Sequence, residues 1–121
     1  MEIAIIAHDG KKAEMVNFLM KNLDKLKNNN VHLVATGTTG TFVEKAGLKV
    51  NKLLSGPRGG DAQIAARVAE GKTQMVFFFR DPLDKHPHEP DINMLMRLCD
   101  VWNVPLATNP ATASLLIDHL P

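Results

Sequence analysis

Residues 1–27 read MEIAIIAHDGKKAEMVNFLMKNLDKLK, and they decide the fold class. The apolar run Ile3–Ala7 is typical of a strand that is buried on both faces of a sheet. After a polar turn, four apolar residues recur at spacings of four, four and three residues, namely Met15, Leu19, Leu23 and Leu26. This spacing predicts one amphipathic helix over Lys11–Lys27. The chain therefore opens with a β-α unit.

The same alternation continues along the rest of the chain. Four further apolar runs predict strands over Val31–Ala35, Val50–Leu54, Met75–Phe79 and Val104–Ala107. The stretches after them predict helices over Thr41–Ala46, Ala62–Glu70, Asp91–Trp102 and Ala111–His119, with Gly47 and Gly71 as C-terminal stops. Five such units predict an α/β fold with a parallel sheet covered by helices. No long linker interrupts them, so we expect a single domain over residues 1–121.

Composition narrows the range of partners and compartments. The 14 basic and 13 acidic residues give a formal net charge of +1, and the chain has no Tyr and one Trp. We therefore expect no nucleic-acid partner, since neither a basic surface nor aromatic platforms are present. Cys99 is the single cysteine and cannot form an internal disulfide. The first apolar run is too short for a signal peptide or a membrane span, which predicts a cytoplasmic protein without a membrane partner.

Small and hydroxyl residues gather directly after the predicted strands, where open parallel sheets bind their ligands. Thr36-Gly37-Thr38-Thr39-Gly40 combines three hydroxyls with two glycines at a strand-to-helix junction, and Ser55-Gly56 repeats the pattern. Backbone N–H groups at such junctions attract phosphate. Neither segment matches a Walker loop or a dinucleotide fingerprint, and two ordinary capping turns are the structural alternative. Lys12 beside both turns favours a site for a phosphomonoester.

Asp61 follows three glycines and a proline at the start of a predicted helix. One interpretation is a helix N-cap, as for most Asp residues in this position. The other is a carboxylate base that the glycines allow a substrate to approach. A helix N-terminus lowers the pKa of a carboxyl group, so a base needs burial or neighbouring carboxylates to restore it. Asp81 and Asp91 are the candidates for that support.

The segment 80–91, RDPLDKHPHEPD, holds three prolines and two histidines and is long for a connection in a small domain. His86 and His88 form an H-x-H pair without cysteines, which is weak evidence for zinc. A neutral histidine that polarises a carbonyl or moves protons is the favoured function. Asp91 is alternatively the cap of the following helix. A carboxylate base, a histidine and phosphate-binding turns suit proton removal beside the carbonyl of a small phosphorylated ketone.

Five segments resemble the methylglyoxal synthase family in order and spacing: AHDGKK (7–12), ATGTTG (35–40), LLSGPRGGD (53–61), FFFRDPLDKHPHEPDI (77–92) and VWNVPLATNPATA (101–113). The resemblance implies a cytoplasmic lyase that converts dihydroxyacetone phosphate to methylglyoxal and inorganic phosphate through an enediolate, with no metal or organic cofactor. It implies a three-layer, doubly wound domain with strand order 3-2-1-4-5, assembled as a homohexamer. Inorganic phosphate would be the product and a candidate inhibitor. Because the chain ends at Pro121, we expect no subunit contact through the C-terminal extension of longer members.

The resemblance also assigns roles to residues. It makes Asp61 the catalytic base, His88 the histidine beside the substrate oxygens, and Asp81 and Asp91 supporting carboxylates. The substrate and phosphate contacts are His8, Lys12, Thr36, Gly37, Thr38, Thr39, Ser55 and Gly56. The same fold also occurs as a regulatory ligand-binding module in carbamoyl phosphate synthetase, and a structural or adaptor domain is a third alternative. The presence of both Asp61 and His88 argues against the module, and the polar residues after the strands argue against the adaptor.

Overall fold

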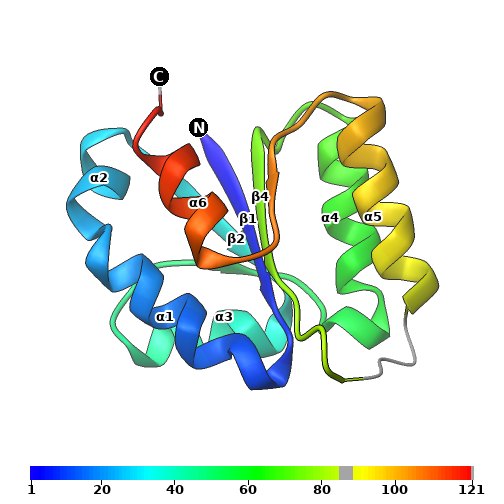
Figure 1. The fold of residues 1–121 in the computed structure, drawn as a ribbon, viewed down its shortest axis with the longest axis horizontal. Helices are drawn as coiled ribbons and strands as arrows, with labels where there is room; N and C mark the ends of the chain where they lie inside the picture. The colour runs from blue at the N-terminus through cyan, green and yellow to red at the C-terminus, as the bar shows by residue number, and fades with distance from the viewer. Residues whose placement is uncertain (85–88, 121) are drawn as a thin grey trace.

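Five parallel strands form one sheet in the order β3-β2-β1-β4-β5 (Figure 1). The structure is a computed structural model that describes residues 1–84 and 89–120. The strands are β1 Glu2–Ala7, β2 His32–Ala35, β3 Asn51–Lys52, β4 Met75–Phe79 and β5 Leu106–Ala107. The predicted fold class and strand order are confirmed.

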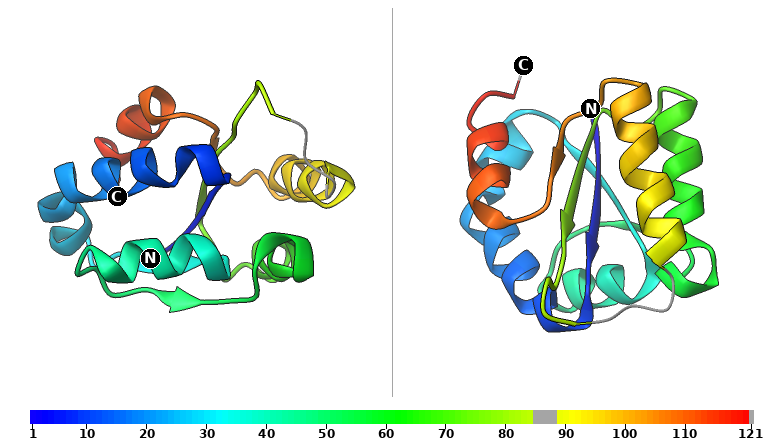
Figure 2. Two further views of the ribbon diagram at one scale, coloured as in Figure 1. Left: turned by 90° about the horizontal axis from the view of Figure 1, so that it is seen from below. Right: turned by 45° about the vertical axis from the view of Figure 1, so that its right-hand side comes forward.

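Helices cover both faces of the sheet, which gives three layers (Figures 1 and 2). They are α1 Lys12–Lys21, α2 Leu23–Asn28, α3 Gly37–Lys45, α4 Gly60–Ala69, α5 Glu89–Val101 and α6 Pro110–Ile117, with 3-10 turns η1 Asp9–Lys11 and η2 Gly56–Arg58. Alternate residues of β1 enter different cores, since Ile3 and Ile5 pack with α1, α2, α3 and α6 while Ala4 and Ile6 pack with α4 and α5. None of these helices is long and apolar enough to cross a membrane.

The inner strands β1 and β4 fix the positions of the loops that follow their carboxyl ends. Ile5 pairs with Phe77 and Ala7 with Phe79 in parallel register. Phe18 of α1 meets Phe77 and Phe79 edge-on, with ring centroids 5.5 and 5.7 Å apart. Burying each such side chain stabilises the fold by about 2 kcal/mol. The ends of β1 and β4 are therefore held side by side.

The single helix predicted over Lys11–Lys27 is wrong, because the chain forms α1 and α2 with a break at Asn22. The side-chain amide of Asn22 donates to the Phe18 carbonyl oxygen at 2.8 Å. Its backbone N–H lies 3.2 Å from the carbonyl oxygens of both Phe18 and Leu19. Local side-chain bonding of this kind competes with the regular helical pattern and ends α1.

The helix predicted over Thr41–Ala46 begins four residues earlier, at Gly37. A Cβ on Gly37 would lie 3.0 Å from the Leu53 carbonyl oxygen, and one on Gly40 would lie 2.4 Å from Lys52 Cγ. Both glycines thus permit close packing of α3 against the segment around β3. They belong to the first turn of α3, so the predicted start of this helix at Thr41 is wrong.

Other element bounds differ less from the predictions. β3 and β5 are two residues each, and in β5 the preceding Pro105 cannot donate to a ladder. Gly47 (φ +95°) and Gly71 (φ +76°) follow α3 and α4 in the left-handed conformation that ends helices, as predicted.

A polar cluster around Glu2 lies at the amino ends of the strands, opposite the loops that carry the cleft. The Glu2 carboxylate accepts hydrogen bonds from Arg67 Nε at 3.0 Å and Nη2 at 2.6 Å, and from the Thr73 hydroxyl. Burial raises the pKa of Glu2, but the hydrogen bonds from Arg67 and Thr73 and the charges of Arg67 and Lys72 together lower it below its ordinary value. The cluster ties β1 to α4 and to the start of β4.

Candidate active site

A cleft of about 460 Å³ opens at the carboxyl ends of the strands. It brings together eight of the predicted site residues: His8, Lys12, Thr36, Thr38, Thr39, Ser55, Gly56 and Asp61. They come from the segments after β1, β2 and β3, as the α/β topology requires. A second cleft of about 580 Å³, lined by Lys11, Arg80 and Asn109 among others, contains none of the predicted site residues. The smaller cleft is therefore the candidate active site.

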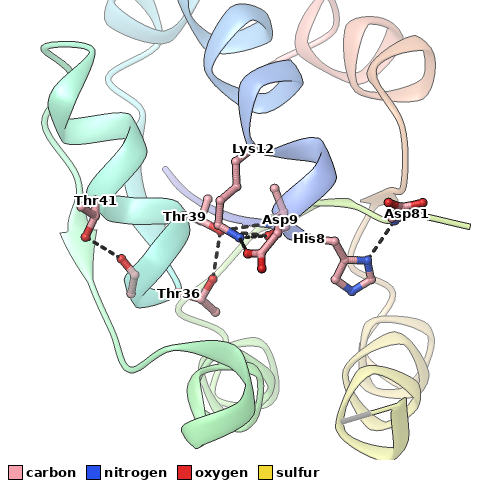
Figure 3. Close-up of polar contacts among 9 residues, drawn as sticks. His8, Asp9, Lys12, Thr36, Thr39, Thr41 and Asp81 are labelled. Atoms are coloured by element: carbon pink, nitrogen blue, oxygen red, sulfur yellow. Dashed lines mark hydrogen bonds and ion pairs between the residues drawn. The ribbon is translucent and has the colours of Figure 1, made fainter. Parts of the chain in front are cut away.

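Lys12 supplies a buried positive charge to the cleft. Its ammonium donates to the Ala7 carbonyl oxygen at 2.8 Å and to Asp9 Oδ1 at 2.7 Å (Figure 3). An ammonium has three N–H donors, so within the described part of the chain one remains for a ligand. The contact with Asp9 offsets the cost of burying the charge.

The first turn of α3 presents amide and hydroxyl groups to the same cleft. Thr36 is the N-cap residue, although its side chain makes no capping hydrogen bond. The Thr39 hydroxyl accepts from the Ala7 N–H at 3.1 Å and lies 3.3 Å from the Thr36 hydroxyl, which joins α3 to the end of β1 (Figure 3). Among the described residues the N–H groups of Thr38 and Thr39 find no backbone acceptor, as expected in a first helical turn. These two amides are donors suited to an anion.

Asp61 lies in the first turn of α4 and is fully buried, yet it lines the cleft. The N-cap of α4 is Gly59, so the interpretation of Asp61 as a cap is wrong. A Cβ on Gly56 would lie 3.2 and 3.3 Å from the two carboxylate oxygens, whereas a Cβ on Gly60 would lie 2.0 Å from the Leu54 carbonyl oxygen. Gly56 leaves room beside the carboxylate, and Gly60 allows the turn that carries it.

His8 stands at the end of β1, and its Nδ1 accepts a hydrogen bond from the Asp81 N–H at 2.9 Å (Figure 3). Asp81 is therefore adjacent to the site although it does not line the cleft. Gly37 does not line it either, and its Cα faces the backbone of the segment 53–55. Asp91 lies in the first turn of α5, which begins at Glu89, so Asp91 is not the N-cap of this helix. His86 and His88 lie outside the described residues.

Sequence reasoning missed five residues that line the cleft: the apolar Ile6 and Ala7 at the end of β1, and Asp9, Pro57 and Asp84. Asp9, Pro57 and Asp84 all stand within the segments quoted for the site, and that place in the sequence is the signal that could have indicated them. Asp84 belongs to the long connection after β4, which the fold brings to this cleft. In residues 1–84 and 89–120 no group of three or more His, Cys, Asp or Glu side chains is arranged to hold a metal ion.

The strand order is the one expected for this class of α/β domain. The family model of the MGS-like domain matches residues 15–108. The chain is 55% identical to a methylglyoxal synthase from Acholeplasma laidlawii, over 99% of this chain and 98% of that protein. It is 52% identical to one from Moorella thermoacetica, over 99% and 93%. The crystal structure of methylglyoxal synthase from Elizabethkingia anophelis matches with a TM-score of 0.89 and 41% identity, covering 96% of this chain and 76% of that one. The chain belongs to the methylglyoxal synthase family.

Proposed function

We propose that this chain is a lyase that converts dihydroxyacetone phosphate to methylglyoxal and inorganic phosphate. Its relatives over nearly the whole chain are methylglyoxal synthases. The observation that carries the proposal is the buried Asp61 carboxylate, which lines the same cleft as Lys12 and the first turn of α3. A carboxylate beside an anion site fits a substrate with a phosphate at one end and an acidic C–H at the other.

Asp61 is the base in this mechanism. Its carboxylate takes a proton from the hydroxymethyl carbon, and the electron pair of the broken C–H bond forms an enediolate with the neighbouring carbonyl carbon. The hydroxyl proton of the enediolate is then lost, its electrons form the aldehyde C=O, and the double bond shifts toward the carbon that carries the phosphate. The bond between that carbon and the bridging oxygen breaks, and the departing phosphate takes up the hydroxyl proton. The resulting enolate takes a proton back from Asp61 at its terminal carbon and becomes methylglyoxal. No oxidant, reductant or metal is needed to balance these steps.

The phosphate group binds to Lys12, to the Thr36–Thr39 turn with Gly37 inside it, and to Ser55 and Gly56. Support comes from the remaining Lys12 N–H donor and from the Thr38 and Thr39 amides at the positive end of α3. These contacts also decide the outcome of the reaction. Elimination requires the bridging C–O bond to lie parallel to the π orbital of the enediolate, and the phosphate turns hold it in that orientation.

The carbonyl end of the substrate faces His8 and His88. The resemblance assigns His88 the polarisation of the carbonyl oxygen, with Asp81 and Asp91 in support. We propose that no metal or organic cofactor takes part and that inorganic phosphate, the product, is also an inhibitor. The reaction as written is complete with side chains alone.

We also propose a cytoplasmic homohexamer with no nucleic-acid partner. Near-zero net charge argues against a polyanion, and large apolar side chains that are exposed in one chain favour self-association: Phe42, Leu83, Trp102 and Leu115. Sedimentation velocity tests the assembly, because a hexamer has six times the 13.3 kDa of the chain. A monomer at micromolar concentration would contradict it.

The experiment for the activity compares wild type, Asp61→Asn and Asp24→Asn in an assay of methylglyoxal formed from dihydroxyacetone phosphate. Asp24 is an exposed residue of α2 and serves as a matched control. We expect Asp61→Asn to lower kcat by about 10²–10⁴-fold, the usual contribution of a general base, while phosphate still binds. Asp24→Asn should match wild type. A wild-type chain that binds phosphate in calorimetry but forms no methylglyoxal would instead be a ligand-binding module.

A further inference from the structure

The imidazole of His8 is held from several directions at the end of β1. The Asp81 N–H donates to Nδ1 at 2.9 Å, and Phe78 meets the ring edge-on at a centroid distance of 5.2 Å. The His8 backbone N–H donates to the Phe79 carbonyl oxygen at 3.2 Å, and the His8 carbonyl oxygen accepts from Lys11 at 2.8 Å. The ring orientation is therefore set by Phe78 of β4 and by the Asp81 N–H, whose bond to His8 is drawn in Figure 3.

The bond from Asp81 determines which ring nitrogen carries a proton. A backbone N–H can only donate, so Nδ1 must offer its lone pair, and in a neutral imidazole the proton then lies on Nε2. The resemblance already implies that His8 contacts the substrate; we propose that the main-chain N–H of Asp81, rather than its carboxylate, fixes His8 in the neutral form that carries its proton on Nε2. This inference rests on the proposed function, since the donor needs a substrate oxygen to serve.

Gly10 and the Asp81 carboxylate set the position of that amide. Asp81 Oδ1 accepts a hydrogen bond from the Leu83 N–H at 3.1 Å, which closes a local turn after β4. A Cβ on Gly10 would lie 2.7 Å from Asp81 Oδ2, closer than a carbon and an oxygen approach each other. Gly10 therefore leaves the space in which this turn forms. Gly10 and Asp81 are positioning residues for His8.

The charges around His8 do not all favour a neutral ring. In the described residues the titratable groups of the cleft are Asp9, Lys12, Asp61 and Asp84, and Asp81 lies beside the ring. Carboxylates favour an imidazolium, and Lys12 opposes it. Protonation at Nδ1 would direct an N–H at the Asp81 N–H, so the hydrogen bond must first break. We expect this bond to favour the neutral ring over the imidazolium.

The test is nitrogen NMR of the full chain labelled with ¹⁵N-histidine, with His8→Gln to assign the resonances. Wild type should show an acceptor Nδ1 and a protonated Nε2 on His8 across the range from about pH 5.5 to 8, around the ordinary pKa. Asp81→Asn should keep this form, because it retains both the N–H and the acceptor for Leu83. Asp81→Pro lacks the N–H and should mix the tautomers and raise the titration midpoint by about one pH unit, and the acidic limb of kcat/KM should move with it.

A second variant covers the case in which Asp81→Pro fails to fold. Gly10→Ala should turn the Asp81 carboxylate away from the Leu83 N–H, loosen the Asp81 amide and mix the tautomers in the same direction to a smaller extent. A protonated Nδ1 on His8 of an active wild-type chain overturns the inference and leaves the proposed function intact. Unchanged tautomers in Gly10→Ala and Asp81→Pro overturn it as well. A chain with the Nε2–H form that makes no methylglyoxal overturns the proposed function instead.

Discussion

The substitution Gly56→Ala tests how strongly the rate depends on the position of the Asp61 carboxylate, because it should move the carboxylate and change the stability of the loop little. The added methyl would lie 3.2 and 3.3 Å from the carboxylate oxygens, so the carboxylate must move by a few tenths of an ångström. Misplacing a reacting group by 1 Å costs about 10²-fold in rate, and the methyl also screens the base from the substrate. We therefore expect kcat to fall by about ten- to a hundredfold. The Ala N–H remains, so affinity for inorganic phosphate should change little.

Gly60→Ala is the matched comparison, because its methyl would lie 2.0 Å from a main-chain oxygen that cannot rotate away. Overpacking of this severity destabilises by about 3 kcal/mol, whereas Gly56→Ala should cost less than about 1 kcal/mol, or roughly 4 °C in Tm. Methylglyoxal formation and thermal unfolding measure the two effects separately. If Gly56→Ala retains more than half of wild-type kcat, the carboxylate does not approach substrate past Gly56 and the assignment of Asp61 as base loses its geometric support.

Three further predictions concern other parts of the chain. Lys12→Met should weaken phosphate binding in calorimetry by about ten- to a hundredfold, and Thr38→Ala, which loses the hydroxyl but keeps the amide, should weaken it less; unchanged affinity in both would remove the two side chains from the site. Arg67→Met should lower the free energy of unfolding by about 1–2 kcal/mol at pH 7. The pKa of Glu2 is lowered in the fold, so this difference should shrink as the pH falls below the ordinary value of 4.5, and a difference that is constant with pH in denaturant titrations would contradict the ion pair. Burial, with a smaller effect of Asp100, raises the pKa of the Cys99 thiol to about 11, so a disulfide reagent should label the unfolded chain and not the native one.

The central strands and the loops that carry the cleft could be predicted because their pattern is local. Met75–Phe79 is apolar at every position and forms β4 with those bounds. The start of α3 could not be predicted, since Gly37 and Gly40 are poor helix formers. Glycine is needed at these two positions because α3 packs closely against residues 52–55. Likewise, either glycine or aspartate can cap α4, and only the folded chain shows that Gly59 takes that position.

The contact between His8 and Asp81 shows a second limit of sequence reasoning. The two residues are 73 positions apart, and they meet because β1 and β4 are neighbours in the sheet. The resemblance implied this strand order, but the main-chain donor has no sequence signal, since every residue except proline carries one. The sequence indicates Asp81 by its carboxylate, whereas its contact with His8 is made by its backbone N–H.

The two edge strands have a consequence for how copies of this chain can associate. β3 and β5 are only two residues long, and β3 ends in Lys52, whose ammonium pairs with Glu44 of α3 at 2.8 Å. Edges this short, with a charged lysine on β3, offer no long row of N–H and C=O groups to a strand from another molecule. The homohexamer proposed above would therefore not extend the sheet from one chain to the next. It would assemble through side-chain contacts of helices and loops, and substitutions on those surfaces should alter its size without altering the sheet.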